Sequence, residues 1–97
     1  MTKMLTMCTV RPLPPEQRNR LLRAEAEVVT RHYVEGKLDR FWGREDGKGG
    51  VLIYNTASAA EAEGWVKELP LTRENYLTYE LIPIGPLRTL QFLLPAV

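Results

Sequence analysis

A carboxylate in the middle of the first long helical segment is the sharpest chemical signal in the sequence. At about 100° per residue, Glu25 falls within the apolar arc of this segment and His32 lies beside it, seven residues on. The arc consists of Leu21, Leu22, Val28 and Val29, and a charged stripe of Glu16, Arg20, Arg23, Glu27 and Arg31 occupies the other side. Burial raises the pKa of a carboxyl group, so Glu25 is a candidate general base or acid. The alternatives are that Glu25 lies at the edge of the arc and extends its carboxylate to solvent, or that it forms a structural pair with His32 or an arginine.

A second candidate group follows the helical segment. Arg40, Trp42 and Arg44 alternate along a strand-like stretch, so they share one face. Arginine binds carboxylates in a bidentate manner, and tryptophan offers a flat surface and an N–H donor. These residues therefore predict a site for an anionic or planar ligand. The alternative is an edge strand with charged residues facing solvent and Trp42 in the core.

Four further residues are weaker candidates. Tyr54 and Tyr79 could each direct a phenol into a pocket, although tyrosine is common in strands. A histidine such as His32 more often has a hydrogen-bonded structural role, and we expect Cys8 to be a small buried strand residue. We expect Tyr54, Tyr79, His32, Arg40 and Trp42 to bind substrate if Glu25 is catalytic.

The elements that must position these residues are short and separated by Pro and Gly. Pro14-Pro15-Glu16 is typical of a helix start, Gly36 of a helix end, and Ser58 with Glu61 of a capping box. The pattern predicts strands over residues 5–10, 38–44, 51–56 and 76–82, a helix from about 15 to 35, and a second helix from 58 that ends at Pro70.

This order, βαββαβ, predicts an α+β, ferredoxin-like domain over residues 1–86, with a four-stranded antiparallel sheet and two helices on one face. The third strand is apolar on both faces, so the uncovered face should be buried by the same face of another subunit. Residues 87–97 form an apolar tail that includes Leu90 and Phe92, and we expect it to pack on a neighbouring subunit or to fold back on its own.

Composition limits the possible partners. The chain has 97 residues, with 13 Lys and Arg, 12 Asp and Glu, and a net charge of +1, which argues against nucleic acid or an anionic membrane as the main partner. One cysteine and one histidine allow neither an internal disulfide nor a structural zinc site, and no metal-ligand spacing occurs. No apolar run is long enough to span a membrane, and the N-terminus does not read as a signal peptide. We therefore expect a cytoplasmic protein.

Read together, these features resemble the muconolactone isomerase family, within the larger group of dimeric α/β barrels. The likeness spans nearly the whole chain and depends on order and spacing more than on any one motif. It is carried by Met7-Cys8-Thr9-Val10 with Leu13-Pro14-Pro15, by Glu25, by Gly36-Lys37-Leu38 with Arg40 and Trp42, by Gly47, by Val51-Leu52-Ile53-Tyr54, by Leu69-Pro70-Leu71, and by Glu80-Leu81-Ile82-Pro83. The chain departs from the family at Met7, at Gly43, and in the tail from Leu87.

The resemblance implies a ferredoxin-like subunit paired sheet to sheet, as a homodimer or a larger ring. It also implies isomerisation of a small unsaturated lactone by movement of a proton, without metal or cofactor. A glutamate at Glu25 and a tryptophan at Trp42 are shared with the family. Two other hypotheses stay open: a cofactor-independent monooxygenase with Trp42, Tyr54 and Tyr79 around its pocket, and a non-catalytic oligomer that binds a small ligand.

Overall fold

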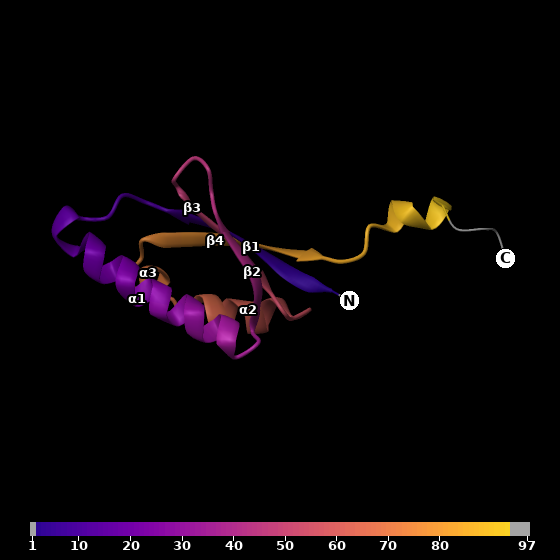
Figure 1. Ribbon diagram of the computed structural model, residues 1–97, viewed down its shortest axis with the longest axis horizontal. Coiled ribbons are helices and arrows are strands. Elements are labelled where there is room, and N and C mark those ends of the chain that lie inside the picture. The colour runs from indigo at the N-terminus through magenta and orange to yellow at the C-terminus, as the bar shows by residue number, and fades with distance from the viewer. Residues whose placement is uncertain (1, 94–97) are drawn as a thin grey trace.

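The computed structural model of the protein describes residues 2–93 and has one four-stranded antiparallel sheet with helices on one side (Figure 1). Its elements, in chain order, are β1 (Lys3–Val10), α1 (Pro15–Val34), β2 (Leu38–Gly43), β3 (Gly49–Tyr54), α2 (Ala59–Val66), α3 (Pro70–Arg73), β4 (Leu77–Ile84) and a 3-10 helix η1 (Arg88–Leu93). The strand order is β2-β3-β1-β4. The predicted α+β, ferredoxin-like class is confirmed.

Side-chain alternation separates the two faces of the sheet. On β1, Met4, Thr6 and Cys8 are buried beneath the helices, while Leu5 and Met7 point to the other face. The buried core runs through the sheet, α1, α2 and α3, and comprises Met4, Cys8, Leu21, Leu38, Leu52, Tyr54, Ala62, Val66, Leu69, Leu71 and Leu77.

Helix α1 has the boundaries that its sequence predicts to within a residue. Pro15 occupies its first turn, where a missing N–H costs nothing, and Gly36 follows its end with φ +79°. The face of α1 that meets the sheet buries Leu21 and His32 completely. Glu25 lies between them along the helix and is partly buried.

The second helix ends earlier than predicted. The capping box is present, since Ser58 Oγ accepts a hydrogen bond from Glu61 N–H at 3.1 Å, but α2 stops at Val66. Pro70 does not end a helix; it begins the short helix α3, because proline is well suited to the first helical position. Leu71, just inside α3, is therefore buried against α1 and the sheet.

The face of the sheet opposite the helices carries apolar side chains that the described residues leave open. Met7 is 36% exposed, Ile82 40% and Trp42 54%. Beyond β4, η1 extends away from the body of the molecule, with Leu90 and Phe92 exposed (Figure 1). The tail thus does not fold back as far as residue 93, and residues 94–97 lie outside the described part. Pairing with a second subunit remains a prediction.

Candidate functional site

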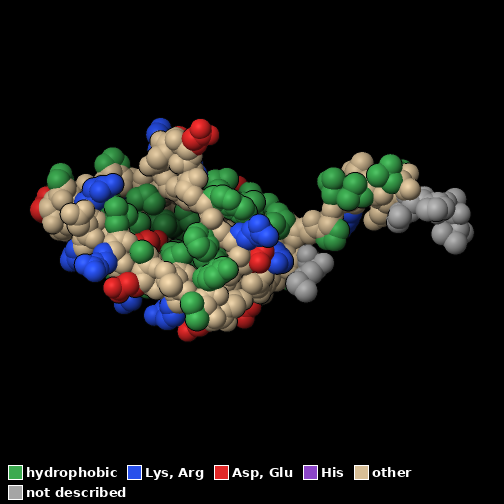
Figure 2. Space-filling view, in the orientation of Figure 1, with side chains coloured by type: hydrophobic (Ala, Val, Ile, Leu, Met, Phe, Trp, Pro, Cys, Tyr) green, Lys and Arg blue, Asp and Glu red, His purple; other side chains and the backbone are tan. Residues whose placement is uncertain are grey.

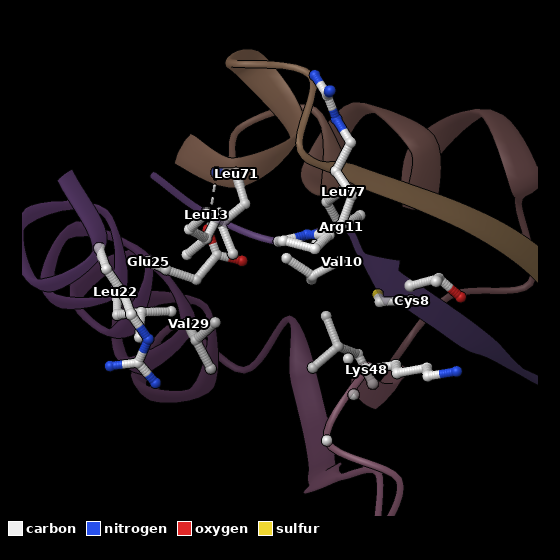
Figure 3. Close-up of a pocket in the computed structure, with 17 residues that line it drawn as sticks. Cys8, Val10, Arg11, Leu13, Leu22, Glu25, Val29, Lys48, Leu71 and Leu77 are labelled. Carbon is white, nitrogen blue, oxygen red and sulfur yellow. Dashed lines mark hydrogen bonds between the residues drawn. The ribbon is translucent and has the colours of Figure 1, made fainter. Parts of the chain in front are cut away.

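A cavity of about 690 Å³ opens between α1, the end of β1, the β2–β3 hairpin and α3 (Figures 2 and 3). In Figure 2 it is the hollow whose walls are mostly hydrophobic. Its volume lies within the range of ordinary small-molecule sites. Its walls are formed by Cys8, Thr9, Val10, Arg11, Pro12, Leu13, Arg18, Leu22, Glu25, Val29, Gly47, Lys48, Gly49, Gly50, Leu52, Leu71 and Leu77.

Glu25 is the carboxylate of this cavity. Its Oε1 accepts a hydrogen bond from the Leu71 N–H at 3.0 Å, and its other oxygen points into the cavity (Figure 3). Burial raises the pKa of Glu25 above its ordinary value, and the Leu71 hydrogen bond offsets part of that rise. One oxygen is thus fixed by the backbone while the other faces whatever occupies the cavity.

The Leu71 N–H is available because of where α3 begins. The first N–H groups of a helix have no acceptor within that helix, and Pro70 at the first position has no N–H at all. Leu71 therefore supplies a backbone donor on the cavity wall, and Glu25 from α1 satisfies it. The hydrogen bond joins α1 to α3 through two residues that are 46 positions apart in the chain.

Cys8 lies on the cavity wall but is not a reactive thiol. It is 1% exposed, and burial, together with the nearby Glu25 charge, raises the pKa of its thiol to about 12. A thiol in this state stays protonated near neutral pH and is a poor nucleophile. The predicted role of Cys8 as a small buried strand residue fits this environment.

Three cationic side chains, Arg11, Arg18 and Lys48, stand around the cavity. Arg11 Nε donates to the Asn75 carbonyl at 2.8 Å, and its guanidinium lies 4.8 Å from the centre of the Tyr76 ring. These positive charges make the approach to the cavity favourable for an anion.

His32 and Tyr54, expected to bind substrate, do not line this cavity and lie in the core. His32 Nε2 is 2.9 Å from Glu68 Oε1, and its Nδ1 is 3.1 Å from the Tyr54 hydroxyl. Both His32 and Tyr54 are fully buried. Burial raises the pKa of Tyr54, so its hydroxyl stays protonated and shares a hydrogen bond with Nδ1.

Arg40 and Trp42 share one face of β2, as predicted, but it is the face opposite the helices. They pair with Ile53 and Val51 of β3 and border a shallow surface depression of about 410 Å³ on the edge of the sheet. Glu25 is on the other side of the sheet, so one subunit does not bring these residues together.

Tyr79 is also turned away from the cavity. Its hydroxyl donates to Glu63 Oε1 at 2.9 Å, between β4 and α2. Of the six predicted site residues, Glu25 alone lines the cavity. Sequence reasoning missed the Leu71 backbone donor, which the preference of proline for a first helical position could have indicated.

Neither a cluster of metal-ligating side chains nor a helix that could span a membrane occurs in the described part of the chain. Between residues 2 and 93, no three His, Cys, Asp or Glu side chains gather as metal ligands. Over the same span, no helix has the length and apolar character needed to cross a membrane.

Comparison with known proteins shows the fold. No protein-family model and no curated protein sequence matches the chain. The structure is similar to that of muconolactone isomerase, with a TM-score of 0.71 and 19% identity over 89% of this chain and 90% of that one. It is also similar to 5-chloro-2-hydroxyhydroquinone dehydrochlorinase from Burkholderia phenoliruptrix AC1100 in complex with 2,5-dihydroxybenzoquinone. That match has a TM-score of 0.59 and 18% identity over 89% of this chain and 93% of that one.

Proposed function

We propose, from the fold shared with muconolactone isomerase, that the protein is an enzyme that moves a proton on a small unsaturated lactone or related carbonyl compound. Glu25 is the group that takes and returns the proton, and no cofactor takes part. The observation that carries the proposal is the state of this carboxylate. It is partly buried in a largely apolar cavity, one oxygen is held by the Leu71 N–H, and burial raises its pKa.

The proposed reaction needs only one ionisable side chain. Ionised Glu25 removes a proton from a carbon atom whose acidity is raised by a conjugated carbonyl group, and then returns the proton to another carbon on the same face. A raised pKa makes the carboxylate a stronger base and its protonated form a suitable acid near neutral pH. Because the Leu71 N–H fixes one oxygen, the free oxygen is held in one orientation toward the substrate.

Charge and size support a small anionic ring compound. Arg11, Arg18 and Lys48 border the cavity, and their positive charges favour the approach of an anion. The two similar structures are named for enzymes of small oxygenated compounds, a lactone isomerase and a hydroquinone dehydrochlorinase. A cavity of about 690 Å³ has room for a single substituted ring.

The monooxygenase hypothesis has less support. It places Trp42, Tyr54 and Tyr79 around the substrate, but these side chains lie on the open sheet face, in the core and against α2. The described residues that line the cavity are aliphatic, cationic or glycine apart from Cys8, Thr9, Pro12 and Glu25.

Proton exchange in heavy water tests the proposal. The protein is incubated with a panel of unsaturated lactones, and proton NMR shows which compounds lose a carbon-bound proton or shift a double bond. Glu25→Gln keeps the shape of the side chain and removes the base, so exchange should fall by roughly 100-fold or more. Glu27→Gln, on the exposed stripe of the same helix, is the matched control and should change little. Full exchange by the Glu25→Gln protein would refute the proposal.

A further inference from the structure

We propose that His32 and Glu68 form a positioning pair that holds residues 68–71 so that the Leu71 N–H stays bound to Glu25. Neither residue touches the cavity. The inference rests on the proposed function, since it concerns how that function's carboxylate is oriented. His32 and Glu68 act through the backbone of α3 and are not catalytic residues.

Two hydrogen bonds join α1 to this short segment, one at each end. His32 bonds to Glu68 at 2.9 Å, and Glu25 bonds to Leu71 at 3.0 Å. The two α1 residues are seven positions apart, which is about two helical turns, so both project from the same side of α1. Arg31 Nη2 adds a third contact, at 3.1 Å to the same Glu68 oxygen. Residues 68–71 are therefore hydrogen-bonded to α1 at both ends of the segment.

The His32 end of this arrangement is fixed by its own partners. The Glu68 carboxylate can only accept, so His32 Nε2 carries the proton and donates it. Nδ1 is hydrogen-bonded to the Tyr54 hydroxyl at 3.1 Å. Rotating the buried ring would leave the Tyr54 hydroxyl without its partner in the core, which is costly. The imidazole is thus held in one orientation.

The segment between the two hydrogen bonds is stiff. Leu69 and Leu71 are buried, at 0% and 3% exposed, and Pro70 between them has a restricted φ. With three of its four residues fixed in this way, a displacement at Glu68 moves the Leu71 N–H as well. The bond to Glu25 is therefore sensitive to a residue at the outer surface, where the Glu68 side chain is 41% exposed.

Electrostatics and positioning predict opposite responses when Glu68 is removed. The groups nearest Glu25 are the Cys8 thiol on β1, the Leu71 N–H and the more distant Tyr54 hydroxyl on β3. The cations Arg11, Arg18 and Lys48 also border the cavity, but in Figure 3 the Arg11 and Lys48 side chains extend away from Glu25. Through its charge alone, loss of Glu68 lowers the pKa of Glu25 or leaves it unchanged. Loss of the Leu71 hydrogen bond raises that pKa, because the bond favours the ionised carboxylate.

The test compares variants at position 68 in the full chain, with no substrate. Carbon-13 NMR follows the titration of the Glu25 carboxyl, and proton NMR follows the Leu71 amide. Glu68→Ala should move the Glu25 midpoint to higher pH and shift the Leu71 amide proton upfield. Glu68→Asp keeps the charge but is one methylene shorter, so it should act in the same direction. Glu68→Gln keeps an acceptor for His32 and should leave the Leu71 amide in place.

Glu63→Ala is the matched control, since it removes a carboxylate from α2 that bonds Tyr79 and Lys67 and is not joined to residues 68–71. It should not raise the Glu25 midpoint. An unchanged or lower midpoint in Glu68→Ala, or an equal rise in Glu68→Gln, would overturn the positioning role. These readouts need no turnover. An active Glu25→Gln variant would therefore refute the proposed function. The positioning role of His32 and Glu68 would still be decided separately, by the titration of Glu25 in the position-68 variants.

Discussion

Gly49 at the start of β3 offers a sharp test of how the cavity wall is built. It pairs with Thr9 of β1, and its φ of +151° lies in a region that other residues rarely adopt. A Cβ atom there would stand 2.1 Å from the Cys8 carbonyl oxygen and 2.8 Å from the carbonyl carbon. Both are backbone atoms, so no side-chain rotation relieves the contact. Gly49→Ala should force β3 away from β1 where Cys8 and Gly49 both line the cavity.

The cost of this substitution follows from two effects. A non-glycine residue in such a backbone region costs about 1–3 kcal/mol, and parting the strands weakens their pairing in addition. For a domain of this size, each 1 kcal/mol lowers Tm by about 4–8 °C. Gly49→Ala should therefore lower Tm by roughly 10 °C or more.

Thermal unfolding measures this effect, with Gly64→Ala as the control. Gly64 lies in α2, and a Cβ there would meet nothing within 4 Å. Alanine should stabilise that exposed helical position by up to about 1 kcal/mol. A Gly49→Ala protein with the Tm of the wild type would contradict the close approach of β3 to the Cys8 carbonyl.

Three further predictions concern charge and assembly. Glu25→Gln should raise Tm at pH 8 but not at pH 3. Burial raises the pKa of Glu25 in the folded state, so ionisation of this carboxyl costs stability as the pH rises through that pKa. Equal effects on Tm at both pH values would argue against a raised pKa. Sedimentation at micromolar concentration should show a dimer or a multiple of a dimer, and Ile82→Lys should dissociate it. A stable wild-type monomer of 11.1 kDa would rule out the subunit pairing. Deleting residues 87–97 should loosen the oligomer or cause aggregation, whereas unchanged size and Tm would make the tail a passive extension.

The long elements could be predicted because their signals are strong and local. Helix α1 has both a proline start and a glycine end, and the predicted strands lie within two residues of β1 to β4 at each end. The position of Glu25 in the apolar arc of α1 predicted its burial and the direction of its pKa shift. These inferences depend on residues typical of helix ends and on helical and strand periodicity, all of which are local in the sequence.

The environment of β2 could not be predicted, because it depends on an irregularity. Leu38 faces the helices, and simple alternation would place Arg40 and Trp42 on the same face as Leu38. The register of β2 against β3 shifts between Leu38 and Arg40, so the later residues turn to the open face. The sequence has no clear signal of this bulge.

The sequence also did not show that the His32 and Tyr54 side chains lie in the core rather than in the cavity. A helical wheel gives the side of α1 on which His32 lies, but not whether that part of the helix borders a cavity or the core. Pro70 was ambiguous in a similar way, since proline ends one helix as readily as it begins the next. Only when Pro70 begins a helix is the Leu71 N–H left free to bond to Glu25.

Two titrations of one protein together show whether the ionised Glu25 carboxylate is the base. Carbon-13 NMR gives the midpoint at which the Glu25 carboxyl ionises, and the pH dependence of kcat/KM for a compound that exchanges its proton gives the acidic limb of the rate. If this carboxylate is the base, the two midpoints should coincide and lie above the ordinary value of about 4.3 for a glutamate. A rate that stays constant while Glu25 gains its proton would show that another group is the base.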